Sequence, residues 1–182
     1  MKVVLHICCG VCAAGAVKRL TAEGHGVVGV FYNPNVHPSE EYARRLEAAR
    51  EVARQLHFPL EVPPYDSQEW FKEVVGLESE PEGGRRCEVC FRLRLKRTRW
   101  YMEECGGDAF TSTLTISPYK SAETINRIGR ELDGKRFLVR DFKKKEGFRR
   151  AVETARKLGL YRQSYCGCLY SMREQGRATG IV

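Results

Sequence analysis

The chain has 182 residues, of which 42% are hydrophobic and 30% are charged, with 31 Lys and Arg against 23 Asp and Glu. This composition suits one globular domain, which we expect to span residues 1–182, and the net charge of +8 favours a polyanionic partner without requiring one. No stretch approaches the ~20 apolar residues of a membrane span, and no signal peptide precedes the first apolar run, so we expect a cytoplasmic protein with no membrane partner.

Short β-branched runs alternate with longer amphipathic stretches along the chain. In chain order we expect strand 3–7, helix 12–23, strand 27–32, helix 39–58, strand 60–62, helix 67–75, helix 87–104, strand 109–114, helix 122–132, strand 137–142 and helix 147–158. The run at 27–32 is almost continuously apolar, which is typical of a parallel strand covered on both faces. The pattern therefore predicts an α/β fold, with a mostly parallel open sheet, helices on both faces and right-handed crossovers.

Seven of the eight cysteines fall into three tight groups. The groups are Cys8, Cys9 and Cys12, then Cys87 and Cys90, then Cys166 and Cys168. Cytosolic thiols are held reduced, so clustered cysteines there indicate a metal or redox site rather than a structural disulfide framework. We expect one site assembled from segments 8–12, 87–90 and 166–168. Cys105 stands apart, and we expect it to be a buried structural thiol.

The first cysteine group lies where the first strand ends and its helix begins, which is the edge at which open α/β sheets bind ligands. Cys8 and Cys9 together with Cys87 and Cys90 supply four thiolates, enough for tetrahedral zinc or a [4Fe–4S] cluster. Adjacent cysteines are an awkward chelate for a single ion, so we favour the cluster. Only Gly10 stands in this loop, so a phosphate-binding fingerprint is weakly supported.

Cys166 and Cys168 remain outside such a four-thiol site, and three interpretations stay open. They form a strained, easily reduced disulfide that passes two electrons, they hold a second metal with a carboxylate such as Asp141, or they belong to the same metal site. Cys12 also lies outside the four-thiol site.

Basic residues are dense around the cysteines and suit a nucleic-acid backbone, although about half of them are expected to be the solvated face of a helix. They are Arg85, Arg86, Arg92, Arg94, Lys96, Arg97, Arg99, Arg140, Lys143, Lys144, Lys145, Arg149 and Arg150. Four tyrosines could stack on bases or give protons, or lie at the edge of the core: Tyr119, Tyr161, Tyr165 and Tyr170. We expect His6 to be buried and hydrogen-bonded rather than a metal ligand.

An ordered set of motifs resembles the cobalamin-independent epoxyqueuosine reductases, the QueH family, across nearly the whole chain. These motifs are HICCGVC, FYNPNVHPSEEYARRLE, EPEGGRRCEVCFRLRL, TSTLTISPYKS, RDFKKKEGFRRA and GLYRQSYCGC. The resemblance implies a fold related to the adenine nucleotide alpha-hydrolases. It also implies reduction of epoxyqueuosine at the wobble position of tRNA to queuosine, the final step of queuosine biosynthesis, with electrons from an unidentified donor.

Carried over residue by residue, the resemblance implies that Cys8, Cys9, Cys87 and Cys90 hold a [4Fe–4S] cluster. It implies that Cys166 and Cys168 form a second catalytic group, either a redox-active disulfide or, with Asp141, the ligands of a mononuclear iron, for which Cys12 is a further candidate. Gly10-Val11 departs from the Ala-Pro of that family without changing a ligand.

Two other functions fit the same residues. A zinc-stabilised RNA-binding module without catalysis would use the same cysteines and basic residues. A sulfur-transfer tRNA enzyme that consumes ATP would need a phosphate loop, which the sequence does not contain.

Overall fold

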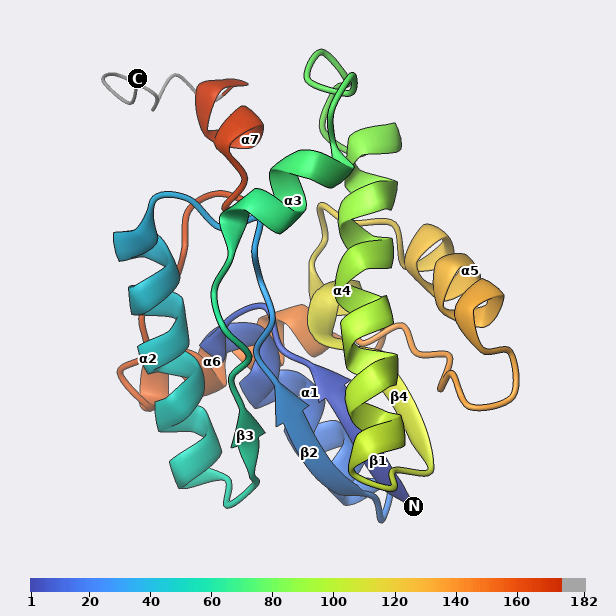
Figure 1. The fold of residues 1–182 in the computed structure, drawn as a ribbon. Coiled ribbons are helices and arrows are strands. Elements are labelled where there is room, and N and C mark those ends of the chain that lie inside the picture. Colours follow the sequence, from blue (N-terminus) through green and yellow to red (C-terminus); the bar gives the residue numbers. More distant parts are fainter. Residues whose placement is uncertain (175–182) are drawn as a thin grey trace.

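The computed structural model describes residues 1–174 and contains a four-stranded parallel sheet in the order β3-β2-β1-β4 (Figure 1). The strands are β1 (Lys2–His6), β2 (Gly26–Val30), β3 (Leu60–Glu61) and β4 (Ala109–Ser112). Every pairing is parallel, with Val4 of β1 opposite both Val28 of β2 and Phe110 of β4. All carboxyl ends of the strands therefore lie at the same edge of the sheet.

Helices cover both faces of this sheet, as the sequence predicts. They are α1 (Gly10–Ala22), α2 (Ser39–Gln55), α3 (Ser67–Glu73), α4 (Arg85–Glu104), α5 (Ala122–Leu132), α6 (Gly147–Lys157) and α7 (Leu169–Glu174), with a 3₁₀ turn, η1 (Thr113–Ile116), after β4. Helix α1 packs against α2 and α6 on one face, and α4 packs against β1, β4 and α5 on the other (Figure 1). Among the described residues, no helix is long and apolar enough to cross a bilayer.

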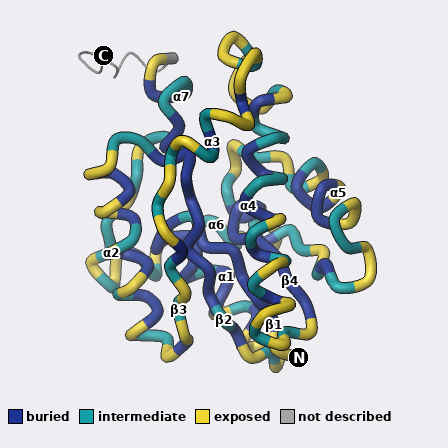
Figure 2. The backbone as a smooth tube through the Cα atoms, viewed as in Figure 1, coloured by how far each residue is buried: buried dark blue, intermediate teal, exposed yellow. Residues whose placement is uncertain are grey.

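Alternation along β1 divides the core between the two faces. Val3 and Leu5 belong to the apolar cluster around α1, whereas Val4 belongs to the cluster around α4 with Phe110 and Leu95. These strand residues are fully buried, and Figure 2 shows the exposed class concentrated on outer helix faces and on the loop that precedes α4. The predicted α/β fold is confirmed.

The predicted strand at 137–142 is wrong. Only Phe137 forms a bridge, to Phe110, and the chain then leaves the sheet because the Asn126 side chain of α5 bonds both backbone groups of Arg140. The strand predicted at 109–114 also ends early, at Ser112. Its hydroxyl accepts a hydrogen bond from the Leu114 backbone N–H at 3.1 Å and starts η1.

Candidate active site: two adjoining cysteine-lined cavities

The first cysteine group occupies the turn from β1 into α1, at the carboxyl edge of the sheet. Cys9 is the N-cap residue, and its sulfur accepts a hydrogen bond from the Cys12 backbone N–H at 3.4 Å. Gly10 is required by packing, because a Cβ there would lie 2.7 Å from the Ala48 carbonyl oxygen of α2. The glycine therefore brings α1 against α2, rather than forming part of a phosphate loop.

The sulfur atoms of Cys8, Cys9 and Cys12 all lie within 4.8 Å of one another, close enough to share one metal ion or cluster. The sulfurs of Cys8 and Cys9 are 3.8 Å apart. The Thr113 hydroxyl donates to the Cys8 sulfur at 3.3 Å, and the Gln163 amide donates to the Cys9 sulfur at 2.9 Å. Residues from two distant segments thus orient this cysteine triad.

The three thiols differ in acidity because they share hydrogen bonds. Bonds from Cys12 and Cys9 hold the pKa of Cys8 well below its ordinary value, and the same contact with Cys8 raises the pKa of Cys12. The bond with Cys12 lowers the pKa of Cys9, but the bond with Cys8 and burial outweigh it and raise that pKa to about 12. Cys8 is therefore the sulfur that carries negative charge most readily.

Cys87 and Cys90 lie three residues apart in the first turns of α4 and so face the same way. The Cys87 sulfur accepts from the Gly83 backbone N–H at 3.2 Å, and the Cys168 sulfur accepts from that of Ser171 at 3.3 Å. Burial raises the pKa of both α4 thiols, and burial together with Cys166 raises that of Cys168 to about 12. In the protein without metal, these thiols are neutral.

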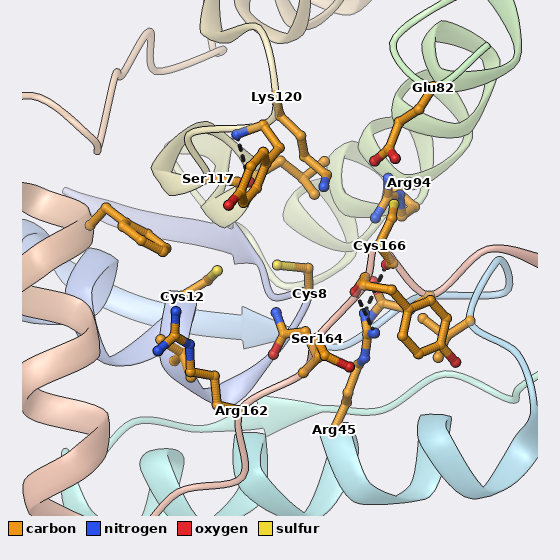
Figure 3. Close-up of a pocket in the computed structure, with 18 residues that line it drawn as sticks. Cys8, Cys12, Arg45, Glu82, Arg94, Ser117, Lys120, Arg162, Ser164 and Cys166 are labelled. Atoms are coloured by element: carbon orange, nitrogen blue, oxygen red, sulfur yellow. Dashed lines mark hydrogen bonds between the residues drawn. The ribbon is translucent and has the colours of Figure 1, made fainter. Parts of the chain in front are cut away.

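Two adjoining cavities bring the three cysteine groups together. The larger, of about 570 Å³, is lined by Cys8, Cys12 and Cys166, and Figure 3 shows the Cys8 and Cys12 sulfurs facing one another across it. The smaller is lined by Cys87, Cys90, Cys166 and Cys168. Both share Glu82, Arg94, Tyr119, Lys120 and Cys166. Cys166 thus lies on the wall common to the two.

Two cations face these thiols. Arg94 is 2% exposed, and its Nε donates to the Cys90 carbonyl at 3.1 Å. Lys120 reaches into the larger cavity from the loop between η1 and α5 (Figure 3). Burial lowers its pKa, but the charges of Cys166 and Cys8 outweigh that effect and the net shift is upward. The site is therefore built for anionic sulfur or an anionic ligand.

The backbone around Cys166 is fixed by a buried ion pair that the sequence did not reveal. Arg45 of α2 pairs with Glu41 at 2.7 Å and donates to the Cys166 and Tyr165 carbonyls at 2.9 and 3.0 Å. The His37 N–H donates to the Gly167 carbonyl at 2.7 Å. The only sequence feature that could have indicated this ion pair is the i,i+4 spacing of Glu41 and Arg45, but such spacing is usually found on the solvent-exposed face of a helix.

Other predicted residues lie outside the two cavities. The Asp141 carboxylate accepts from the Lys143 backbone N–H at 3.2 Å and lines a separate cavity with Arg19 and Glu23, so the structure does not bring it to the cysteines. Its role as a metal ligand stays a prediction. Cys105 is only partly buried, which corrects its predicted burial. All eight cysteines are free thiols, and the Cys166–Cys168 disulfide stays untested.

His6 is buried and satisfied, as predicted. Its Nε2 donates to the Tyr32 carbonyl at 3.1 Å, which leaves Nδ1 to accept from the Ser112 hydroxyl at 2.9 Å. Burial and the nearby Arg94 lower its pKa to about 4, so the ring is neutral. His6 is a structural link between β1, β2 and β4.

Some of the predicted RNA-binding tyrosines and arginines make contacts inside the protein, whereas others are exposed. The hydroxyls of Tyr161 and Tyr165 donate to the Glu41 carboxylate and the His37 carbonyl, whereas Tyr119 is 83% exposed at the mouth of both cavities. Arg86 and Arg94, predicted as part of a basic surface, are buried.

The cysteine triad at the carboxyl edge of this α/β sheet has the sulfur spacing that can hold a metal ion. The sequence model of the family described as "Epoxyqueuosine reductase QueH" matches residues 3–174. The chain belongs to that family.

Relatives of this name align over most of both chains. The one from Streptococcus pyogenes serotype M1 is 39% identical over 96% of this chain and 72% of its own. The one from Dehalococcoides mccartyi is 36% identical over 96% and 94%, and the one from Thermotoga maritima is 33% identical over 95% and 91%. The similarity therefore spans the whole site and not one motif.

Proposed function

We propose that this protein reduces epoxyqueuosine in tRNA to queuosine. The observation that carries the proposal is that six cysteines line two adjoining cavities, with Cys9 in contact with Cys8, in a member of the QueH family. Converting an epoxide to an alkene breaks two C–O bonds, consumes two electrons and two protons, and releases water. A pair of thiols can give two electrons and two protons once, by forming a disulfide, so repeated turnover requires a redox centre that an external donor reduces.

For that centre we propose a [4Fe–4S] cluster held by Cys8, Cys9, Cys87 and Cys90. The donor types fit, because all four are free thiols and thiolate is the ligand that such clusters use. Cys8, Cys87 and Cys90 line the cavities, and the Cys9 sulfur lies within 4.8 Å of that of Cys8. The cluster would supply electrons one at a time. The contact of Cys12 with Cys8 and Cys9 supports it as an alternative ligand or as part of a second iron site.

Cys166 and Cys168 are proposed as the second catalytic group. Cys166 borders both cavities and Cys168 lines the smaller one, which supports a role between the first site and the substrate. Either a redox-active disulfide or a mononuclear iron fits two free thiols one residue apart. A contribution of Asp141 to that iron would require its loop to approach the cavity.

The larger cavity is proposed as the substrate pocket. Its volume of about 570 Å³ suits a modified nucleoside side chain, and its walls carry both positive charge and thiols. Lys120 and Arg94 favour negative charge there, so they would stabilise charge that develops on the departing epoxide oxygen. Tyr165 also lines this cavity, and Arg45 donates to its backbone carbonyl.

The test is anaerobic purification followed by measurement of iron, acid-labile sulfide, zinc and visible absorption, and then assay on tRNA that contains epoxyqueuosine. About four irons and four sulfides per chain, with a band that bleaches on reduction and formation of queuosine, are the expected result. Stoichiometric zinc in a colourless, folded protein would contradict the proposal and favour a zinc-stabilised RNA-binding module.

A further inference from the structure

Two segments of the chain are strongly basic. Residues 143–162 carry eight Lys and Arg against two Glu, and residues 85–99 carry seven Lys and Arg against one Glu, so each segment has a net charge of +6. Segment 143–162 comprises the turn before α6, helix α6 itself and the start of the strand-free stretch that leads to Cys166. Helix α6 packs on α1, on the face of the sheet away from α4 (Figure 1).

The arginines on the α4 and α5 face are largely neutralised by acidic neighbours. Their ion pairs are Arg92–Glu131, Arg97–Glu69, Arg99–Glu103, Arg127–Glu88 and Arg136–Asp133. In segment 143–162, only Arg149 forms an ion pair with an acidic side chain in the described part of the chain, pairing with Glu146 and Glu153. Lys144, Arg150 and Lys157 are exposed and make no ion pair there. More exposed, unpaired positive charge therefore lies on segment 143–162 than on the α4 and α5 face, where Lys96, Arg130 and Lys135 are unpaired as well.

This charged segment also reaches the mouth of the larger cavity. Phe148, in the first turn of α6, and Arg162, at the end of the segment, both line that cavity. Arg162 points into the opening in Figure 3. A polyanion bound along α6 would therefore reach the mouth of the cavity that Cys8 and Cys12 line. A polyanion bound along α5 would meet fewer unpaired basic side chains.

We propose that segment 143–162 is the surface on which the phosphate backbone of the tRNA anticodon arm docks, so that the modified nucleoside enters the larger cavity. The inference rests on the proposed function, because that function identifies the polyanion as tRNA. Lys and Arg contacts to phosphates bind the nucleic-acid backbone without reading sequence, which suits a surface that only positions the arm.

The experiment compares two variants that each remove three positive charges from exposed residues. The test variant is Lys144→Gln, Arg150→Gln and Lys157→Gln. The control variant is Lys96→Gln, Arg130→Gln and Lys135→Gln, three exposed residues on the α4 and α5 side that also make no ion pair in the described part. Thermal unfolding checks that both remain folded, which is expected because none of these side chains is buried.

Binding is measured by fluorescence anisotropy with an unmodified anticodon stem-loop RNA over a series of salt concentrations. We expect the test variant to bind the RNA about 10- to 100-fold more weakly at low salt. The slope of log Kd plotted against log salt concentration should also fall by about two, because each of the three lost phosphate contacts contributes about 0.7 to it. The control variant should stay within about twofold of the unaltered protein.

Equal losses in the two variants, a larger loss in the control, or no RNA binding by the unaltered protein would each overturn the docking surface. Reduction of epoxyqueuosine tRNA is assayed separately on the same three proteins. Failure of the unaltered protein to reduce it, with the binding pattern intact, would reject the proposed function and leave the surface supported.

Discussion

Arg45 holds Cys166 in place through the backbone: the buried guanidinium donates to the Cys166 carbonyl at 2.9 Å while its Nε pairs with Glu41 at 2.7 Å. The side chain also lies over the Tyr165 ring at 5.4 Å. Helix α2 therefore sets the position of a thiol 121 residues further along the chain. The position of the Cys166 backbone therefore depends on the Arg45–Glu41 ion pair rather than on apolar packing.

Arg45→Met should destabilise the fold by about 3–5 kcal/mol, because it leaves the Glu41 carboxylate buried without its partner. The double variant Arg45→Met with Glu41→Leu should recover most of that stability, since neither charge remains. Its reduction rate should nevertheless stay low, because the Cys166 and Tyr165 carbonyls are still released. Urea unfolding and single-turnover reduction distinguish the two effects. Full activity in the stable double variant would show that Arg45 does not position Cys166.

Gly167, between the two cysteines, has little room for a single added methyl group. Its φ is +105°, and a Cβ would lie 2.8 Å from Arg45 Nη1 and 3.0 Å from Val36 Cγ2. Gly24 is the matched control, with φ +82° and nothing within 4 Å of its Cβ position. Gly24→Ala should cost about 1–2 kcal/mol from backbone strain, whereas Gly167→Ala should cost more and lower activity. Equal losses of stability in the two variants would mean that segment 166–168 shifts without cost to accommodate the added methyl group.

Substitution of single cysteines tests the ligand set. We expect Cys9→Ser and Cys87→Ser to lose most of the iron and sulfide, and Cys105→Ser to keep both, because Cys105 lies at the other end of α4, beside Lys2 at the start of β1. Cys12→Ser is the informative variant, since its sulfur is within 4.8 Å of Cys8 and Cys9. If Cys12→Ser loses the cluster and Cys87→Ser keeps it with full activity, then the proposed four ligands are wrong. Metal analysis of anaerobically purified protein gives the result.

The sequence predicted the sheet well because its strands are governed by local apolar runs. It failed at 137–142, where an equally apolar run is drawn out of the sheet by the Asn126 side chain, a contact across 14 residues. Nothing in the periodicity of that run distinguishes it from a strand. The end of β4 was misplaced for a similar reason, because the Ser112 hydroxyl bonds to the Leu114 N–H and turns the chain.

The candidate site was predictable as a set of residues but not as an arrangement. Cysteine spacing predicted one site assembled from three segments. Residues of all three segments line the two adjoining cavities, and the assembly of one site from them stays a prediction. The spacing did not reveal that the Cys12 sulfur lies within 4.8 Å of those of Cys8 and Cys9, or that Lys120 faces them. The high density of arginines was also misleading as evidence for a basic surface, because Arg86 and Arg94 are buried and donate hydrogen bonds to backbone carbonyls. Such roles depend on tertiary contacts that charge and spacing do not encode.

Tyr119 is the last residue whose role can be tested directly. It is an 83% exposed aromatic side chain that lines both cavities, so its ring is free to contact a ligand that enters them. A base next to the modified nucleoside would stack on its ring. Tyr119→Ala should then raise the KM for tRNA about 5- to 100-fold with kcat nearly unchanged, because stacking contributes about 1–3 kcal/mol per base.

Tyr119→Phe is the matched control, because it keeps the ring and removes only the hydroxyl, and its steady-state kinetics should equal those of the unaltered protein. The stability of neither variant should change, since the side chain packs against little of the protein. If Tyr119→Phe loses kcat as much as Tyr119→Ala does, the hydroxyl rather than the ring acts, and Tyr119 becomes a proton donor to the departing oxygen instead of a stacking surface.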